Sequence, residues 1–288
     1  MIKQLLPIGF LTATALLLIT ACSEQGSDQA ANAEVASNQP ALKLYTLDCG
    51  TIAVSDLDVF ASSGAYAGLK GDLTNTCYLI RHPQGDLLWD LGLPTALAGT
   101  GPQTNGVFTM TMQQTLTTQL SDLGIAPDDI DFMAISHSHF DHTGQADQFP
   151  NSLWLVNNNE FEHMFATEES SLQNAAFTTI SKTTYSGNND VFGDGSVVIL
   201  ASPGHTPGHS VLQVNLPQTG PMLLTGDLYH RTESRASKYV PRFNTDEPQT
   251  RVSMAAFEAL ATELGARVII QHEPTDVATL PKPPLFLD

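Results

Sequence analysis

Short apolar runs separated by turn signals recur along the chain from Leu42 onward. Runs of this length predict β-strands, half-buried where polar residues alternate and fully buried where they do not. Segments with apolar residues three or four positions apart predict helices, and the two kinds together predict helices packed outside two sheets. The expected strands cover 42–48, 75–82, 87–92, 131–136, 153–157, 196–202, 210–215, 221–226 and 267–271, and the expected helices cover 112–123, 160–166 and 248–264, with another starting at His142.

The first 41 residues have a different character. Lys3 precedes an apolar stretch at 5–19 that is shorter than the ~20 residues a membrane-spanning helix needs. It ends in "ITAC", which resembles the lipobox of bacterial lipoproteins and implies removal of a signal peptide (1–21) and lipidation of Cys22. An ordinary cleaved signal peptide or an uncleaved anchor is the alternative. Residues 22–41 are small and polar and predict a flexible tether, which leaves 42–288 as the folded domain.

The lipobox resemblance also implies a location and a redox environment. It points to an exported protein held by lipid at the outer membrane, in the periplasm of a Gram-negative bacterium, and Ser23 favours the outer membrane. With Cys22 lipidated, only Cys49 and Cys77 remain, and an exported compartment permits a disulfide between them. Both lie in apolar, strand-like segments, so two buried free thiols are the alternative, and spacing alone does not decide.

Acidic residues dominate the charge. The 288 residues include 30 acidic and 12 basic side chains, and the net charge of −18 becomes −19 when Lys3 is removed with the leader. A polyphosphate would be repelled, which excludes nucleic acid as the expected partner and leaves a neutral small molecule. Five basic residues lie within 231–251, where they either pair with Glu233, Asp246 and Glu247 or form a local positive rim.

Metal-ligand residues stand at the ends of four apolar runs. Functional sites are commonly found where a rigid strand ends and a loop begins. In "HSHFDH" the first two histidines alternate, so they project to the same side of an extended chain, and the aspartate and third histidine follow as a helix begins. A mononuclear zinc site takes about three protein ligands, and this sequence offers more candidates than that. The excess implies two divalent metals bridged by a carboxylate, and zinc is the default metal. The seven candidates are His137, His139, Asp141, His142, His205, Asp227 and His272.

Four segments, "HSHFDH", "SPGHTPGH", "LLTGD" and "VIIQH", resemble the motifs of the metallo-β-lactamase superfamily. Within it "TCYLI", "LLWDLG", "HFDHTG" and "PGHTPGHS" are similar to the N-acyl-homoserine lactonases over most of 42–275. The resemblance implies an α/β fold, a four-layer αβ/βα sandwich, with both metals in a cleft at the sheet edges. It assigns His137, His139 and His205 to one metal, Asp141, His142 and His272 to the other, and the bridge to Asp227. His209 is left to hydrogen-bond a ligand.

The same resemblance implies a reaction. A metal-bridging hydroxide would open the lactone ring of a neutral N-acyl-homoserine lactone, a quorum-quenching activity, and Asp141 would shuttle the proton. The lactonases often carry a tyrosine three residues after the bridging aspartate. Here Tyr229 is at plus two and His230 at plus three, so His230 is the first candidate to assist the oxyanion and Tyr229 the second. Phe140 is expected to border the cleft, and 107–112 and 239–243 are candidates for an acyl-chain channel, with a core or helix-start role the alternative for 107–112.

Two other kinds of function compete with this hypothesis. A β-lactamase, or another ester or thioester hydrolase of the superfamily, would use the same chemistry, although an aspartate at Asp227 argues against a β-lactamase. A non-catalytic metal-binding lipoprotein is expected to lack a ligand, and none is missing here. The sequence leaves the oligomeric state open, a homodimer included.

Overall fold

The computed structural model describes residues 42–288. The predicted signal peptide (1–21), the tether (22–41) and the lipid on Cys22 lie outside the described residues and stay predictions, as do the exported location and a homodimer. Within 42–288, no helix has the length and apolar character needed to cross a membrane.

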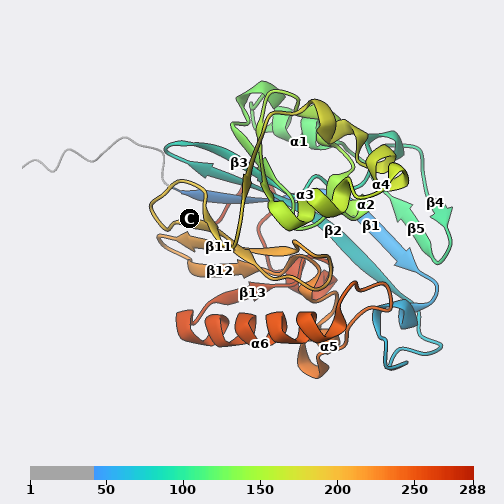
Figure 1. Ribbon diagram of the computed structural model, residues 1–288. Coiled ribbons are helices and arrows are strands. Elements are labelled where there is room, and N and C mark those ends of the chain that lie inside the picture. Colours follow the sequence, from blue (N-terminus) through green and yellow to red (C-terminus); the bar gives the residue numbers. More distant parts are fainter. Residues whose placement is uncertain (1–41) are drawn as a thin grey trace, which may run out of the picture. The chain divides into compact units, whose positions relative to one another are not determined.

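Two β-sheets form the centre of the domain (Figure 1). The larger sheet has eight strands in the spatial order β4 (Gln103–Asn105), β5 (Phe108–Thr111), β1 (Lys43–Val54), β2 (Gly71–His82), β3 (Gly85–Trp89), β6 (Phe132–Ala134), β7 (Leu153–Asn157) and β8 (Lys182–Tyr185). The smaller sheet has five, in the order β13 (Arg267–Ile269), β12 (Gly220–Leu224), β11 (Ser210–Leu216), β10 (Val197–Ala201) and β9 (Asn189–Asp190).

Both sheets combine antiparallel and parallel pairs. β5, β1, β2 and β3 pair antiparallel, and β3, β6, β7 and β8 then run parallel. β9 to β12 pair antiparallel, and β13 joins β12 in parallel. Parallel neighbours end at the same edge of a sheet, so the loops that follow them meet there.

Successive side chains of a strand pack into two different hydrophobic cores, one on each face of the larger sheet. Ile80, Leu87 and Trp89 face the second sheet, whereas their neighbours Leu79 and Leu88 face the helices outside the first sheet. All five are fully buried. This period of two is what the sheet geometry requires when both faces are covered, and it explains why the strands read as continuous apolar runs.

Helices cover the outer face of each sheet. α1 (Leu116–Asp122) and α3 (Asn158–Met164) pack on the larger sheet, and α6 (Glu247–Leu264) packs on the smaller one (Figure 1). This arrangement confirms the predicted four-layer αβ/βα sandwich. The remaining helices are α2 (Phe140–Thr143), α4 (Glu168–Gln173), α5 (Thr232–Ser237) and α7 (Pro274–Val277).

Residues 107–112 do not begin a helix. Most of them form β5, which pairs with β1 at the sheet edge. The following helix, α1, begins at Leu116, because the Thr115 side chain accepts a hydrogen bond from the backbone N–H of Thr118 and caps it there. The helix expected at 112–123 is therefore shorter at its start, and Met112 packs in the core beside β1 instead.

Candidate metal centre

Histidine and aspartate side chains from both sheets meet at one edge of the sandwich. The edge is where β6, β12 and β13 end and where the β10–β11 loop turns. β6 leads into α2, and β12 leads into the short 3-10 turn Gly226–Leu228. The seven residues predicted as ligands from the sequence all lie here: His137, His139, Asp141, His142, His205, Asp227 and His272.

The seven side chains form two groups, each with ligand atoms within 4.8 Å of one another. One group holds His137, His139, His205 and Asp227, and the other holds Asp141, His142 and His272. The carboxylate of Asp227 lies between them. Its Oδ2 is 3.4 Å from Nε2 of both His137 and His205, and its Oδ1 is 3.2 Å from His142 Nε2 and 2.9 Å from His272 Nε2. One oxygen thus faces each group.

The ring nitrogens of the histidines lie close to one another, in an arrangement that suits a bound divalent cation. His137 Nε2 lies 2.8 Å from His139 Nδ1, His139 Nδ1 lies 3.2 Å from His205 Nε2, and His142 Nε2 lies 3.2 Å from His272 Nε2. Ring nitrogens that converge in this way offer lone pairs to a common point, which is how imidazoles bind a transition metal. The residues present could therefore hold divalent metal ions.

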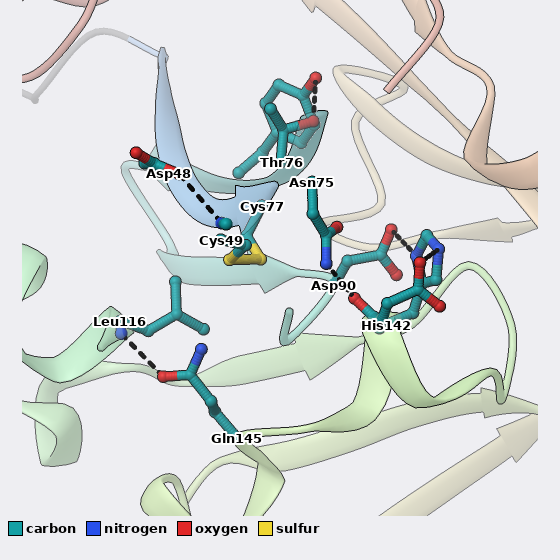
Figure 2. Close-up of a disulfide and its surroundings, with 12 residues drawn as sticks. Asp48, Cys49, Asn75, Thr76, Cys77, Asp90, Leu116, His142 and Gln145 are labelled. Carbon is teal, nitrogen blue, oxygen red and sulfur yellow. Dashed lines mark hydrogen bonds and ion pairs between the residues drawn. A yellow bond between two sulfur atoms is a disulfide. The ribbon is translucent and has the colours of Figure 1, made fainter. Parts of the chain in front are cut away.

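The other ring nitrogen of several histidines has a partner that fixes the ring. His142 Nδ1 lies 3.0 Å from the carboxylate of Asp90 (Figure 2), and His272 Nδ1 donates to the carbonyl of Thr74 at 2.7 Å. His209 donates from Nδ1 to the Ser202 carbonyl and accepts at Nε2 from the backbone N–H of Asp227. The partners of His142 and His272 orient the metal-binding nitrogen of each ring, whereas His209, which is not a candidate ligand, holds the backbone beside Asp227.

Asp90 stands at the end of β3 in a conformation that side chains rarely adopt. Its φ is +60°, in the left-handed region. Its carboxylate accepts hydrogen bonds from the Ser136 backbone N–H at 2.6 Å and from Gln271 Nε2 at 2.8 Å, besides its contact with His142. These contacts hold the strained residue, and such strain is often found at functional sites.

Burial and neighbouring charges shift the pKa values of the site. Burial, reinforced by the nearby His142, holds the pKa of His137 well below its ordinary value, so the ring is neutral and able to bind a metal. Burial lowers the pKa of His209 to about 3. Burial also opposes charge on His142, but the carboxylates of Asp90 and Asp227 outweigh it and raise the pKa of His142 well above its ordinary value. A metal bound at His142 would therefore displace a proton.

A cavity of about 280 Å³ opens directly above the two groups. Its floor contains His139, Asp141, Asp227, His230 and His272. Apolar side chains form its walls. Two of these side chains, Phe140 and Phe243, lie at the rim and are 44% and 40% exposed. The wall residues are Ile52, Phe60, Leu73, Phe108, Phe140 and Phe243.

His230 and Tyr229 face opposite directions. Tyr229 has extended backbone (φ −141°, ψ 138°), in which successive side chains alternate. His230 lines the cavity, with Nε2 2.9 Å from Asp227 Oδ2, whereas Tyr229 is fully buried against Phe257 of α6. The prediction of Tyr229 as a second oxyanion candidate is therefore wrong, because its side chain belongs to the core beneath the smaller sheet.

Only some of the predicted acyl-channel residues line the cavity. Phe108 and Phe243 do, as expected. Val240 is buried in the core beneath the smaller sheet, and Tyr239 packs edge-on against Tyr66.

Most of the basic residues at 231–251 are paired with carboxylates. Arg231 pairs with Glu233 at 3.3 Å, and Arg235 pairs with Glu258 at 2.9 Å. Arg242 pairs with Asp58 and Arg251 with Glu247, whereas Asp246 caps α6 instead of pairing. Among the described residues, no lysine or arginine lines the cavity, so these side chains do not form a positive rim around it.

Comparison with known proteins identifies the family. The model of the metallo-beta-lactamase superfamily matches residues 71–272, most of the domain and all of the candidate centre. The chain belongs to the metallo-beta-lactamase superfamily. The resemblance seen in the sequence motifs is thereby confirmed.

Several named proteins are similar to this chain over most of its length. The N-acyl homoserine lactonase AttM of Azorhizobium caulinodans is 28% identical, over 86% of this chain and 99% of the relative. A solved N-acyl homoserine lactone hydrolase, with N-hexanoyl-L-homoserine bound at its catalytic metal centre, superposes with a TM-score of 0.74 at 24% identity, covering 85% of this chain and 98% of that one. AidC, a dizinc quorum-quenching lactonase, reaches a TM-score of 0.64 at 20% identity, covering 81% and 88%. This member of the superfamily is a metal-dependent hydrolase.

Proposed function

We propose that this protein is a dinuclear metal-dependent N-acyl-homoserine lactonase. The observation that carries the proposal is the cavity, in which a floor of converging histidines and carboxylates lies beneath walls of aliphatic and phenylalanine side chains. A lactone with an acyl chain has this same division between a polar, reactive head and an apolar tail. The lactonases among the relatives support the choice.

The size and lining of the cavity also suit a neutral acyl lactone. Its volume of about 280 Å³ is just below the usual range of ligand pockets, which starts at about 300 Å³. It can hold a lactone ring and the start of an acyl chain, and the exposed rim at Phe140 and Phe243 lets a longer chain continue outward. A phosphorylated substrate would meet no lysine or arginine among the residues that line the cavity.

The proposed centre holds two divalent ions, with zinc as the default. His137, His139 and His205 would bind one and Asp141, His142 and His272 the other, while Asp227 would bridge them. When bound, such ions supply a water molecule of lowered pKa and positive charge for the substrate carbonyl. Asp141 lines the cavity, where its carboxylate can take the proton of the attacking water and return it to the ring oxygen. His230 lines the cavity as well, and its Nε2–H, which is 2.9 Å from Asp227 Oδ2, would turn from that oxygen to donate a hydrogen bond to the carbonyl oxygen as charge develops there.

A substrate panel tests this function. Purified protein is assayed with N-acyl-homoserine lactones of several chain lengths, a cephalosporin and a thioester. We expect the lactones to have the highest kcat/KM, a chelator to abolish turnover because the reaction needs the metal ions, and added zinc to restore it. Faster cephalosporin or thioester cleavage would assign a different hydrolase of the superfamily. Two bound zinc equivalents without turnover of any substrate would indicate a metal-binding protein.

His230 is expected to act on the substrate and not on metal binding. His230→Phe should lower kcat/KM for the lactone by about a hundredfold, the usual cost of removing one oxyanion donor. The ring packs beside Phe60 at 4.6 Å between centroids, so phenylalanine fits there without a polar partner. Zinc content is measured alongside the kinetics and should stay unchanged.

His230→Tyr is the matched control, because it restores a donor three residues after Asp227. It should recover most of the activity lost in His230→Phe. If His230→Phe instead loses zinc, the contact of 2.9 Å with Asp227 serves to hold that ligand, and the assigned role in oxyanion stabilisation is wrong.

A further inference from the structure

A buried carboxylate on α3 lies beside the candidate metal centre without belonging to it. Glu160 is 2% exposed, although charged side chains are rarely buried so deeply. Its Oε1 accepts a hydrogen bond from the Ser138 backbone N–H at 2.7 Å. Its Oε2 accepts from Thr206 Oγ1 at 2.7 Å and from the Gly208 backbone N–H at 2.9 Å. Three donors thus replace the water that burial removes.

These donors come from two loops that carry metal-ligand histidines. Ser138 lies between His137 and His139 in the loop after β6 of the larger sheet. Thr206 follows His205 directly in the β10–β11 loop of the smaller sheet. One carboxylate therefore joins the two chain segments that supply all three histidines of the first group.

The packing around Glu160 leaves little freedom. A Cβ added to Gly208 would lie 2.2 Å from the Glu160 backbone nitrogen, so the β10–β11 loop approaches α3 as closely as glycine allows. A separate backbone hydrogen bond of 2.8 Å, from Ser210 N–H to the Ser136 carbonyl, also links the two loops. The loops should therefore remain together when the Glu160 carboxylate is altered. The histidines they carry would then be positioned less exactly.

We propose that Glu160 is a positioning residue for one metal only, the ion bound by His137, His139 and His205. The inference rests on the proposed two-metal function. Outer partners of this kind typically contribute about ten- to a hundredfold in metal affinity. The second group, Asp141, His142 and His272, receives no hydrogen bond from Glu160, so its affinity should not depend on this side chain.

Zinc titration against a chromophoric chelator tests the proposal on the full-length protein. In Glu160→Gln one end of the side chain becomes an amide NH₂ that faces N–H or O–H donors. We expect one of two zinc equivalents to bind about ten- to a hundredfold more weakly and the other to be unchanged. Glu162→Gln, an exposed neighbour on the same helix, is the matched control and should bind both equivalents as the wild type does.

Ligand variants identify which ion is affected. Combined with His272→Ala, which weakens the second group, Glu160→Gln should still lower the remaining zinc affinity, and combined with His205→Ala it should have no further effect. Thr206→Val, which removes one donor, should weaken the same ion, and Thr206→Ser should not. The melting temperature of the metal-free protein is recorded for every variant, because a merely structural role would lower it and leave both zinc affinities equal to those of the wild type.

Two results would overturn the positioning role. Equal weakening of both ions, or no weakening of either in Glu160→Gln, contradicts it even when the wild type binds two zinc ions and opens lactones. A wild type that binds fewer than two zinc ions contradicts the proposed function and the role of Glu160 together. A wild type that binds two but opens no lactone contradicts the substrate assignment alone.

Discussion

Asp227→Asn is expected to lower kcat/KM for lactone opening by about a thousandfold or more, because bound metal contributes several kcal/mol and each 1.36 kcal/mol is tenfold in rate. The two oxygens of Asp227 face the two histidine groups, at 3.4 Å on one side and at 3.2 and 2.9 Å on the other. Asparagine keeps the shape, but it loses the charge and offers one oxygen in place of two. Bound zinc is counted alongside the kinetics and should fall below two equivalents.

Asp122→Asn is a suitable control for this change. Asp122 is exposed on α1 and belongs neither to the cavity lining nor to the two ligand groups, so the same chemical substitution removes a charge without altering the site. It should leave zinc content and kcat/KM within experimental error of the wild type. An Asp227→Asn protein that keeps two zinc equivalents and most of its activity would show that the carboxylate does not bridge the ions.

The central strands could be predicted from sequence because their apolar runs are long. β7 was expected at 153–157 and occupies Leu153–Asn157. The short strand β4 carries no such signal, since all of its residues are exposed and polar. It forms because β5 pairs with it, and β5 in turn pairs with β1. Pairing between distant segments stabilises these edge strands, and a local pattern does not contain that information.

The candidate ligands could be found because each stands where an apolar run ends. Asp90 follows such a run as well, in "LLWDLG", so the same rule would have found it. Glu160 gave no comparable signal, because it stands within a helix among other polar residues and its importance lies in what two distant loops place beside it. The place of Tyr229 could not be predicted, because adjacent residues in an extended chain point to opposite faces and the sequence does not show which face lines the cavity.

The pairing of Cys49 and Cys77 also depended on information that the sequence does not contain. Leu47 pairs with Cys77 in the register of β1 and β2, and the register then shifts between Asp48 and Thr51. Gly50, with φ +113°, lies within the irregular segment, and the two cysteines form a disulfide with Cα atoms 5.9 Å apart. The alternative of two free thiols does not describe this structure. Spacing in sequence could not reveal a local bulge that brings Cys49 beside its partner.

Figure 2 shows the disulfide between Cys49 and Cys77, and the backbone at Gly92, just after Asp90, packs against its sulfur atoms. A Cβ on Gly92 would lie 2.6 Å from Cys49 Sγ, so the backbone there rests directly on the sulfur atoms. The same backbone accepts a hydrogen bond from Gly144 N–H at 2.8 Å, and the N–H of Leu91 donates to the His142 carbonyl at 2.9 Å. The disulfide thus stabilises both the β1–β2 pair and the base of the loop that carries His142.

The double variant Cys49→Ala/Cys77→Ala should accordingly melt about 10 °C below the oxidised wild type. A cross-link between residues 28 apart contributes about 3.5 kcal/mol by limiting the unfolded chain, and a domain of this size loses about 2–4 °C per kcal/mol. Melting is followed by calorimetry with and without reductant. Both sulfurs are fully buried, so the wild type is reduced under denaturing conditions before the comparison.

The double variant serves as its own control, because reductant has no bond to break in it and should leave its melting temperature unchanged. Reduced wild type should melt close to the double variant, since both lack the cross-link. Thiol titration of the denatured wild type provides an independent measurement, and it should find Cys49 and Cys77 unreactive until reductant is added. The cysteines are not joined in the protein if two thiols react and the wild type and variant melt at the same temperature. The stability of the β1–β2 pair would then rest on its strand hydrogen bonds and the surrounding core.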